Sequence, residues 1–280
     1  MSSATCQLIR YRHCVVELSL APGAGLDIQT VEDLDNYLGA VADAGFPSVS
    51  LSLDQLAGDP ERSAEMLATH GLRCHDVLAL QVSRHEEQVL TRVTDLARAA
   101  ELVGAEFVLA LFWSRVSEES IDRFGRCADI VRSAGARLAL EMPPIGELNS
   151  VAASLAIVEA VGIDRAALMI DTFHFMRGSS TWAQLESLRL EALGYVQFDD
   201  ALAPLSDDVM HETVNRRTMP GYGTFDLDRF ATTLTGRGWS GLVSVEVLSA
   251  ELRLLDVPTF ARQAFETTAP YWLRSGSEPA

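Results

Sequence analysis

The 280-residue sequence predicts a single (β/α)8 barrel, the TIM-barrel fold. Short apolar runs rich in β-branched residues alternate along the chain with longer stretches that repeat apolar residues every three or four positions. Eight such pairs can be counted, and the length suits one domain of this kind. We therefore expect residues 1–280 to form one barrel domain, with a frayed tail at 275–280.

The expected strands are short and are bounded by turn residues. In order, they are Cys14–Leu20, Ser48–Leu53, Arg73–Leu80, Glu106–Phe112, Arg137–Met142, Ala167–Asp171, Gly194–Phe198 and Leu242–Val247. Their continuous apolar character is typical of parallel strands that are covered on both faces.

The expected helices lie between these strands and after the last of them. They are Val31–Ala44, Ser63–His70, Glu87–Val103, Glu118–Ala134, Ser150–Val161, Trp182–Leu190, Leu227–Gly236 and Pro258–Tyr271. A glycine stands shortly before the next strand at Gly45, Gly71, Gly104, Gly135, Gly162 and Gly238. Glycine after a helix favours the left-handed cap, so these positions indicate where helices end.

Two loop segments affect the predicted fold and the predicted site. The loop Ala21–Gly25 contains two glycines but lacks the G-x-G-x-x-G spacing, so a doubly wound dinucleotide-binding sheet has no support. The segment Asp199–Thr224 is longer than an ordinary loop between a strand and a helix, and no clear helix is expected in it. We expect this segment to be a lid that carries Arg217, with Pro220–Gly223 as its hinge.

The charge balance excludes several classes of function. The chain has 22 basic residues, all of them arginine, and 39 acidic residues, which gives a net charge of −17. An acidic chain of this kind is not expected to bind nucleic acid or an anionic membrane surface. The absence of lysine also excludes a lysine Schiff base and a phosphate loop built on Gly-Lys-Ser/Thr.

The remaining composition predicts a soluble cytoplasmic protein. The four cysteines (Cys6, Cys14, Cys74 and Cys127) have no C-x-x-C spacing, so we expect reduced, buried thiols rather than a disulfide framework or a zinc ribbon. No apolar run reaches the roughly 18–20 residues of a membrane span. The first residues lack the pattern of a signal peptide.

Polar side chains end four consecutive expected strands, and these strand ends are where TIM barrels carry out chemistry. They are Glu141, Asp171, Gln197 and Glu246. Three carboxylates so close together would repel one another unless a cation neutralised them, and ion pairs with rim arginines are the alternative explanation. Oxygen donors favour one divalent ion, Mn²⁺, Mg²⁺ or Co²⁺ rather than Zn²⁺.

The second half of the sequence resembles the xylose-isomerase-like TIM-barrel superfamily, which includes sugar isomerases and epimerases, inosose and 3-dehydroshikimate dehydratases and endonuclease IV-type enzymes. The resemblance is carried by five short stretches, namely Glu141–Pro144, Ile170–His174, Val196–Asp200, Arg217–Gly223 and Val245–Val247. The first half matches only in its architecture. Few histidines and a net charge of −17 disfavour the endonuclease branch.

The resemblance also implies roles for individual residues. It makes Glu141, Asp171, Gln197 and Glu246 the metal ligands, although histidine often stands where this chain has Gln197. It makes His174 a residue that touches the substrate or the metal, and Arg217 one that binds a substrate anion or hydroxyl.

Further residues are candidates for contact with the substrate because of their position in the chain. Glu212 and His211 share the loop of Arg217, and His75 lies in the third expected strand, either in the core or facing the barrel mouth. Phe112 and Trp113 end the fourth expected strand, where they either pack at the barrel top or form an apolar wall against a sugar ring.

The expected reaction is an isomerisation or epimerisation of a sugar or polyol ketone. A divalent ion polarises the carbonyl and the neighbouring hydroxyl, and a glutamate then removes the proton between them to give an enediolate. Glu141 and Glu246 are the expected acid–base pair, with His174 orienting a substrate oxygen. A dehydratase shares the first step and remains an alternative, as does a non-catalytic barrel that binds no metal. The expected partner is a small, carbohydrate-like molecule, and a homo-oligomer remains open.

Overall fold

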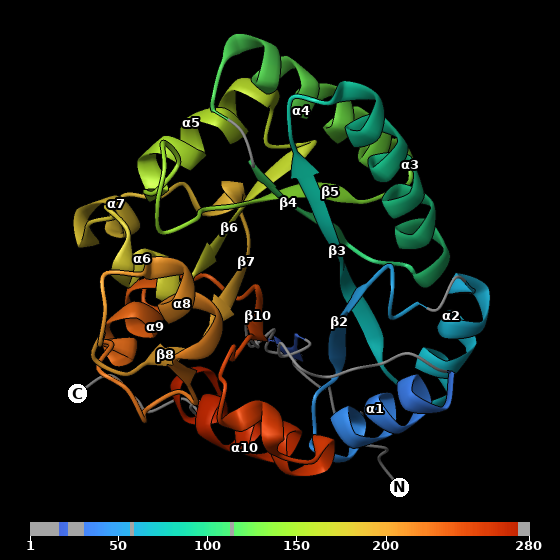
Figure 1. Cartoon of the computed structure of the whole chain (residues 1–280), viewed down its shortest axis with the longest axis vertical. Coiled ribbons are helices and arrows are strands. Elements are labelled where there is room, and N and C mark those ends of the chain that lie inside the picture. Colours follow the sequence, from blue (N-terminus) through green and yellow to red (C-terminus); the bar gives the residue numbers. More distant parts are fainter. Residues whose placement is uncertain (1–16, 22–30, 57–58, 113–114, 274–280) are drawn as a thin grey trace, which may run out of the picture.

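Eight parallel strands close into a barrel. Helices surround the strands (Figure 1). The computed structural model describes residues 17–21, 31–56, 59–112 and 115–273. Within these ranges, consecutive barrel strands are neighbours, and the first strand pairs with the last to complete the closure. The predicted (β/α)8 barrel is confirmed.

The barrel strands agree with the predicted ones to within a few residues. They are β1 (Glu17–Leu20), β2 (Ser48–Ser52), β3 (Arg73–Val82), β4 (Phe107–Phe112), β5 (Arg137–Glu141), β6 (Ala166–Asp171), β7 (Leu193–Phe198) and β10 (Leu242–Val245). The first part of the expected Cys14–Leu20 strand, like Trp113 and the expected tail at 275–280, lies outside the described residues. The last strand ends one residue before Glu246, which therefore lies in the loop that follows it.

An outer ring of helices covers the barrel (Figure 1). It consists of α1 (Val31–Asp43), α2 (Pro60–Thr69), α3 (Glu86–Val103), α4 (Glu118–Ser133), α5 (Val151–Val161), α7 (Trp182–Glu186), α9 (Leu227–Thr235) and α10 (Val257–Trp272). In α4, the Ser117 hydroxyl accepts a hydrogen bond from the Ser120 amide to cap the first turn, and Phe124, Cys127 and Val131 form the buried stripe. All six glycines expected to end helices have positive φ angles, between 68° and 113°.

The barrel interior is filled by side chains and is not a channel. Its apolar cluster contains Phe107, Leu109, Ala139, Ala167, Met169, Tyr195 and Leu242. The packing is close, because a Cβ atom at Gly194 would lie 2.9 Å from both Ala167 and Phe107. This packing gives the strand ends above it a rigid base.

The segment Asp199–Thr224 corrects one prediction, because it does contain a helix. Helix α8 (Val209–Asn215) is capped by Asp208, whose side chain accepts a hydrogen bond from the His211 amide. Two short strands, β8 (Asp200–Ala201) and β9 (Arg217–Thr218), pair antiparallel on either side of it. A helix of two turns is too short to produce a recognisable apolar period, which is why the sequence pattern missed it.

Other short elements also escaped the sequence pattern. Helix α6 (Thr172–Arg177) follows β6 directly, capped by the Asp171 side chain. The expected helix Trp182–Leu190 ends at Glu186, and a 3-10 turn, η1 (Leu190–Ala192), follows it. A second 3-10 turn, η2 (Leu252–Leu254), precedes α10.

Two further predictions can be compared with the described part of the chain. Cys74 and Cys127 are buried free thiols, as expected, while Cys6 and Cys14 lie outside the described residues. Among the described helices, none combines the length and apolar character needed to cross a membrane.

Candidate active site and metal site

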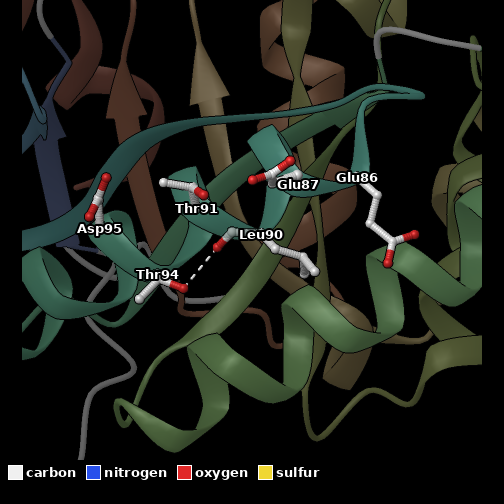
Figure 2. Close-up of a pocket in the computed structure, with 6 residues that line it drawn as sticks. All are labelled: Glu86, Glu87, Leu90, Thr91, Thr94 and Asp95. Atoms are coloured by element: carbon white, nitrogen blue, oxygen red, sulfur yellow. Dashed lines mark hydrogen bonds between the residues drawn. The ribbon is translucent and has the colours of Figure 1, made fainter.

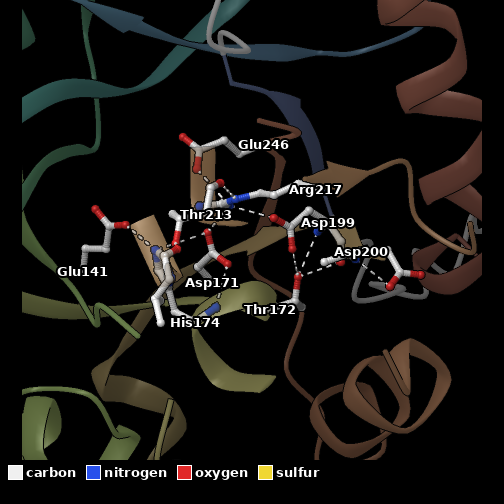
Figure 3. A network of polar contacts seen from close by, with 11 residues as sticks. Glu141, Asp171, Thr172, His174, Asp199, Asp200, Thr213, Arg217 and Glu246 are labelled. Atoms are coloured by element: carbon white, nitrogen blue, oxygen red, sulfur yellow. Dashed lines mark hydrogen bonds and ion pairs between the residues drawn. The ribbon is translucent and has the colours of Figure 1, made fainter. Parts of the chain in front are cut away.

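Polar side chains from adjacent strands meet at the carboxyl end of the barrel, as Figure 3 shows. Glu141 ends β5 and Asp171 ends β6, and Asp171 pairs in register with Gln197 on β7. Glu246 comes directly after β10, which neighbours β7. Because parallel strands all present the same end to one side of the barrel, residues distant in the sequence converge there.

Three side chains at this end of the barrel bring possible metal-binding atoms together. Glu141, Asp171 and His174 each offer one ligand atom, and these atoms lie within 4.8 Å of one another. Nε2 of His174 is 2.9 Å from Oε1 of Glu141 and 3.8 Å from Oδ2 of Asp171. Helix α6 fixes this geometry, because its capping carboxylate and its third residue are Asp171 and His174.

Arg217 lies at the centre of the remaining carboxylates. Its Nη1 atom is 2.6 Å from Oδ2 of Asp171, 2.6 Å from Oδ2 of Asp199 and 3.2 Å from Oε2 of Glu246. Its Nε donates to the Thr213 carbonyl over 2.9 Å, and the guanidinium lies 5.0 Å from the centre of the Phe173 ring. With 1% of its side chain exposed, this arginine is part of the site interior.

Asp199 is a member of the site that the sequence analysis did not assign. Its Oδ2 accepts from Arg217, while its Oδ1 accepts from the Thr172 hydroxyl at 2.6 Å. The sequence feature that could have identified it is the pair of aspartates, Asp199 and Asp200, directly after the apolar β7 strand. The two side chains have different contacts in the structure.

Asp200 fastens the segment that carries Arg217. Its carboxylate accepts hydrogen bonds from the amides of Ala201, Gly221, Gly223 and Phe225, over 2.8 to 3.2 Å. No Cβ fits at Gly223, since it would lie 2.2 Å from Oδ1 of Asp200. The expected hinge at Pro220–Gly223 is therefore tied to β8, and a lid movement would have to break these bonds.

The buried charges shift one another's pKa values. Burial, together with the charge of Asp171, raises the pKa of Asp199 to about 7. Burial also raises the pKa of Glu246, and repulsion from Asp171 and Glu141 raises it further. Together these effects exceed the lowering of this pKa by Arg217 and bring it to about 8. Burial alone would raise the pKa of Asp171, but Arg217 and His174 hold it below its usual value. Burial alone would lower the pKa of His174, but Asp171 and Glu141 raise it.

These contacts fit a divalent cation. Glu141, Asp171, Asp199 and Glu246 carry four carboxylates, and Arg217 is the one guanidinium that the described residues place among them. The Oε1 atom of Gln197 is buried and accepts no hydrogen bond from any described residue. A buried oxygen without a donor is costly, and a metal ion would satisfy it.

A cleft of about 760 Å³ opens beside this cluster. Glu141 and His174 line it, together with Phe112, Met210 and Thr213. Its position next to the possible metal-binding atoms makes it the place where a substrate would meet them.

The other predicted contact residues lie in different surroundings. Glu212 is buried beneath its own loop, where it accepts from the Leu205 amide and pairs with Arg216 at 2.9 Å. His211 is exposed on α8. His75 is buried in the barrel interior, 2.9 Å from Oδ1 of Asp76 and edge-on to the Tyr195 ring, and it does not line the cleft.

Comparison with known proteins identifies relatives of the chain. A family model described as "Xylose isomerase-like TIM barrel" matches residues 38–274. An inosose isomerase of Halalkalibacterium halodurans is 26% identical over 194 residues, which cover 65% of this chain and 67% of that protein. A 3-dehydroshikimate dehydratase of Pseudomonas aeruginosa is 26% identical over 239 residues, which cover 79% of this chain but only 37% of the dehydratase.

Solved structures agree on the fold. A crystal structure of the IOLI protein with a bound zinc atom superimposes with a TM-score of 0.81 and 23% identity, over 94% of this chain and 100% of that one.

Proposed function

This chain belongs to the xylose isomerase-like TIM-barrel family, and we propose that it is a metal-dependent isomerase or epimerase that acts on a sugar or polyol ketone. The observation that carries the proposal is the cluster of Glu141, Asp171, His174 and Glu246 beside a cleft of substrate size. The names of the inosose isomerases among its relatives point to the same reaction class.

Glu141 is the residue that we propose as the base facing the substrate. It lines the cleft, and 16% of its side chain is exposed. Within the described part of the chain, its Oε1 is paired with His174, which leaves Oε2 to take the proton from the carbon next to the substrate carbonyl. The contact between Nε2 of His174 and Oε1, at 2.9 Å, orients the Glu141 carboxylate.

Glu246 is the proposed partner in proton transfer. Burial and repulsion from Asp171 and Glu141 raise its pKa to about 8 in the metal-free protein, and a bound ion would favour the ionised carboxylate that accepts a proton. Returning the proton to the neighbouring carbon gives isomerisation, and returning it to the opposite face of the same carbon gives epimerisation. Arg217 holds Oε2 of Glu246 in position at 3.2 Å.

We propose Glu141, Asp171, Gln197 and Glu246 as the metal ligands, with His174 beside them. When bound, a divalent ion would polarise the carbonyl and hydroxyl oxygens of the substrate and so acidify the proton between them. Carboxylate and amide oxygens favour Mn²⁺, Mg²⁺ or Co²⁺. The bound zinc in the IOLI structure makes Zn²⁺ the competitor to include in a metal analysis.

A dehydratase is the second candidate function. It is favoured by the match to the 3-dehydroshikimate dehydratase, which extends over a larger share of this chain than the match to the inosose isomerase. Both reactions begin with removal of a proton next to a carbonyl, and they differ in whether a β-hydroxyl then leaves as water.

Incubation in D₂O with Mn²⁺ and a panel of inososes, ketoses and 3-dehydroshikimate separates the candidates. Uptake of deuterium without loss of water supports the isomerase or epimerase, whereas a new conjugated absorbance supports the dehydratase. Absence of both reactions, together with no metal in the purified protein, would leave the barrel as a non-catalytic binding protein and contradict the proposal.

A further inference from the structure

The cleft beside Glu141 has walls of a kind that a bare polyol does not need. Most of its described lining is apolar and includes Leu111, Phe112, Val116, Pro143, Ile145 and Met210. Two of them, Ile145 and Met210, keep 46% and 47% of their surface exposed. An apolar wall next to a polar reaction centre is typical of a site that binds an apolar group and orients it with a few polar contacts.

The charged groups along the cleft do not form an anion site. Nε of Arg115 is 3.0 Å from Oε1 of Glu147, and Oε2 of Glu147 also accepts from the Val116 amide at 2.7 Å. The arginine is therefore already paired, and the other lining groups that can carry charge, Glu141 and His174, belong to the reaction centre. Outside the reaction centre, Arg115 is thus the one cation of the described lining, and a phosphate group would have to displace Glu147 from it.

The volume of the cleft indicates a ligand larger than a single sugar ring. About 760 Å³ lies within the roughly 300–1,000 Å³ range of clefts that hold ligands larger than a single sugar ring. A sugar or polyol ketone bound at Glu141 and His174 would fill one end of this space. The apolar remainder would stay in contact with water unless another part of the ligand covered it.

A second cavity of similar size does not compete for this role. It has a volume of about 700 Å³ and lies along α3, where the residues drawn in Figure 2 include Glu86, Glu87, Leu90 and Asp95. Its described lining is mainly acidic and threonine side chains of one helix, without a partner group from the reaction centre. Leu90 is the one apolar residue of its described lining, and none of the lining residues belongs to the reaction centre.

We infer that the natural ligand of the cleft is a sugar-like or polyol-like molecule that carries an aryl or similarly large apolar substituent and no phosphate. This inference rests on the proposed function for the polar end of the ligand. The substituent would lie against Phe112, Ile145 and Met210, while the polyol part reaches Glu141 and His174.

Binding measurements test the inference without requiring turnover. We would compare phenyl and methyl glucosides, as both anomers, by calorimetry with the Mn²⁺-loaded protein. Burial of a phenyl ring predicts affinity about ten- to a hundredfold higher for the phenyl compound. In the variants Ile145→Asn and Met210→Gln, which change exposed side chains, this preference should fall several-fold while methyl glucoside binding stays the same. Leu205→Gln is the matched control, because Leu205 is 77% exposed on the same segment as Met210 and does not line the cleft.

Equal affinity for the two glucosides, or no binding of either, overturns the inference. A change of oligomeric state in the two cleft variants, with the phenyl preference unaltered, would overturn it in favour of a second copy of the chain on the apolar wall. The proposed function fails by a different result, namely the absence of deuterium uptake with every ketone, so the two failures can be told apart.

Discussion

Arg217 and Asp171 are both buried, and the Nη1 atom of the arginine lies 2.6 Å from Oδ2 of the carboxylate. The same oxygen is 3.8 Å from Nε2 of His174, in the group whose atoms are close enough to hold a metal ion. One carboxylate therefore serves both the guanidinium and the proposed cation. In the metal-free chain the arginine neutralises part of the negative charge of the carboxylates, and a bound ion would neutralise more of it.

Removing the guanidinium should make the fold depend on metal. Arg217→Met leaves Asp171 and Asp199 buried without their cationic partner, which should cost about 3–5 kcal/mol of unfolding free energy in EDTA. Saturating Mn²⁺ should then raise the melting temperature of the variant more than that of the wild type. Arg189→Met, at an exposed arginine whose pair with Glu191 spans 3.8 Å, is the control. An equal rise in melting temperature on adding Mn²⁺ to the variant and to the wild type would contradict the claim that Asp171 binds both Arg217 and the metal ion.

Glu246→Gln should separate catalysis from folding. At pH 7 the glutamate is largely protonated in the metal-free protein, since its pKa is about 8, and a neutral amide therefore replaces it at little cost to the fold. We expect a melting temperature within a few degrees of the wild type, metal affinity lowered at least about tenfold, and turnover lost. Glu251→Gln, on the exposed segment before η2, is the control. Full turnover in Glu246→Gln would rule out its role in proton transfer.

The Asp200 carboxylate should matter for the position of Arg217. In Asp200→Asn, an NH₂ group replaces one of the two acceptor oxygens. Some of the four backbone amides that donate to Asp200 would then face another donor and lose their hydrogen bond. We expect faster proteolysis between residues 202 and 224 and kcat/KM lowered about tenfold or more. The exposed neighbour Asp207 provides the control Asp207→Asn. An unchanged cleavage rate would show that these hydrogen bonds do not hold the segment.

Tyr195 should contribute to stability through Asp76. The tyrosine hydroxyl donates to Oδ2 of Asp76 over 2.6 Å in the barrel interior, and both side chains are fully buried. Tyr195→Phe should lower the unfolding free energy by about 1–3 kcal/mol, measured by urea unfolding at pH 7. Tyr222→Phe, at a residue that is 71% exposed, should cost almost nothing.

The pH dependence of this effect has a defined sign. Burial alone would raise the pKa of Asp76, but His75 and the hydrogen bond from Tyr195 hold it below its ordinary value. The ionised carboxylate therefore stabilises the fold above the ordinary carboxyl pKa, and this contribution is lost as the pH falls through the lowered one. The difference in unfolding free energy between Tyr195→Phe and the wild type should become smaller in that acidic range. A constant difference would mean that the hydroxyl acts through packing alone.

The sequence predicted the barrel because each of its strands and most of its helices carry their own local signal. The β-branched runs and the terminal glycines are readable one element at a time, and Glu141, Asp171, Gln197 and Glu246 were recognisable as polar residues at apolar strand ends. Helices α6 and α8 were missed because each has only six or seven residues and is fixed by the capping carboxylate of Asp171 or Asp208.

The place of Arg217 could not be predicted from the sequence. The sequence assigned it to a lid over the substrate, but in the structure it is buried among Asp171 at the end of β6, Asp199 directly after β7 and Glu246 in the loop after β10. That position depends on β8–β9 pairing and on the four hydrogen bonds to Asp200, which are contacts between distant residues. Asp199 was missed for the same reason, since its partners Thr172 and Arg217 come from other elements.

The most direct test of the proposed function is a titration of EDTA-treated protein with Mn²⁺ in D₂O, following deuterium uptake by inosose in a mass spectrometer. The ligand cluster and the proton-transfer role of Glu141 and Glu246 predict an uptake rate that rises with added metal and reaches a plateau at one ion per chain. Uptake that proceeds at the same rate in metal-free protein would contradict a metal-dependent proton abstraction at this site.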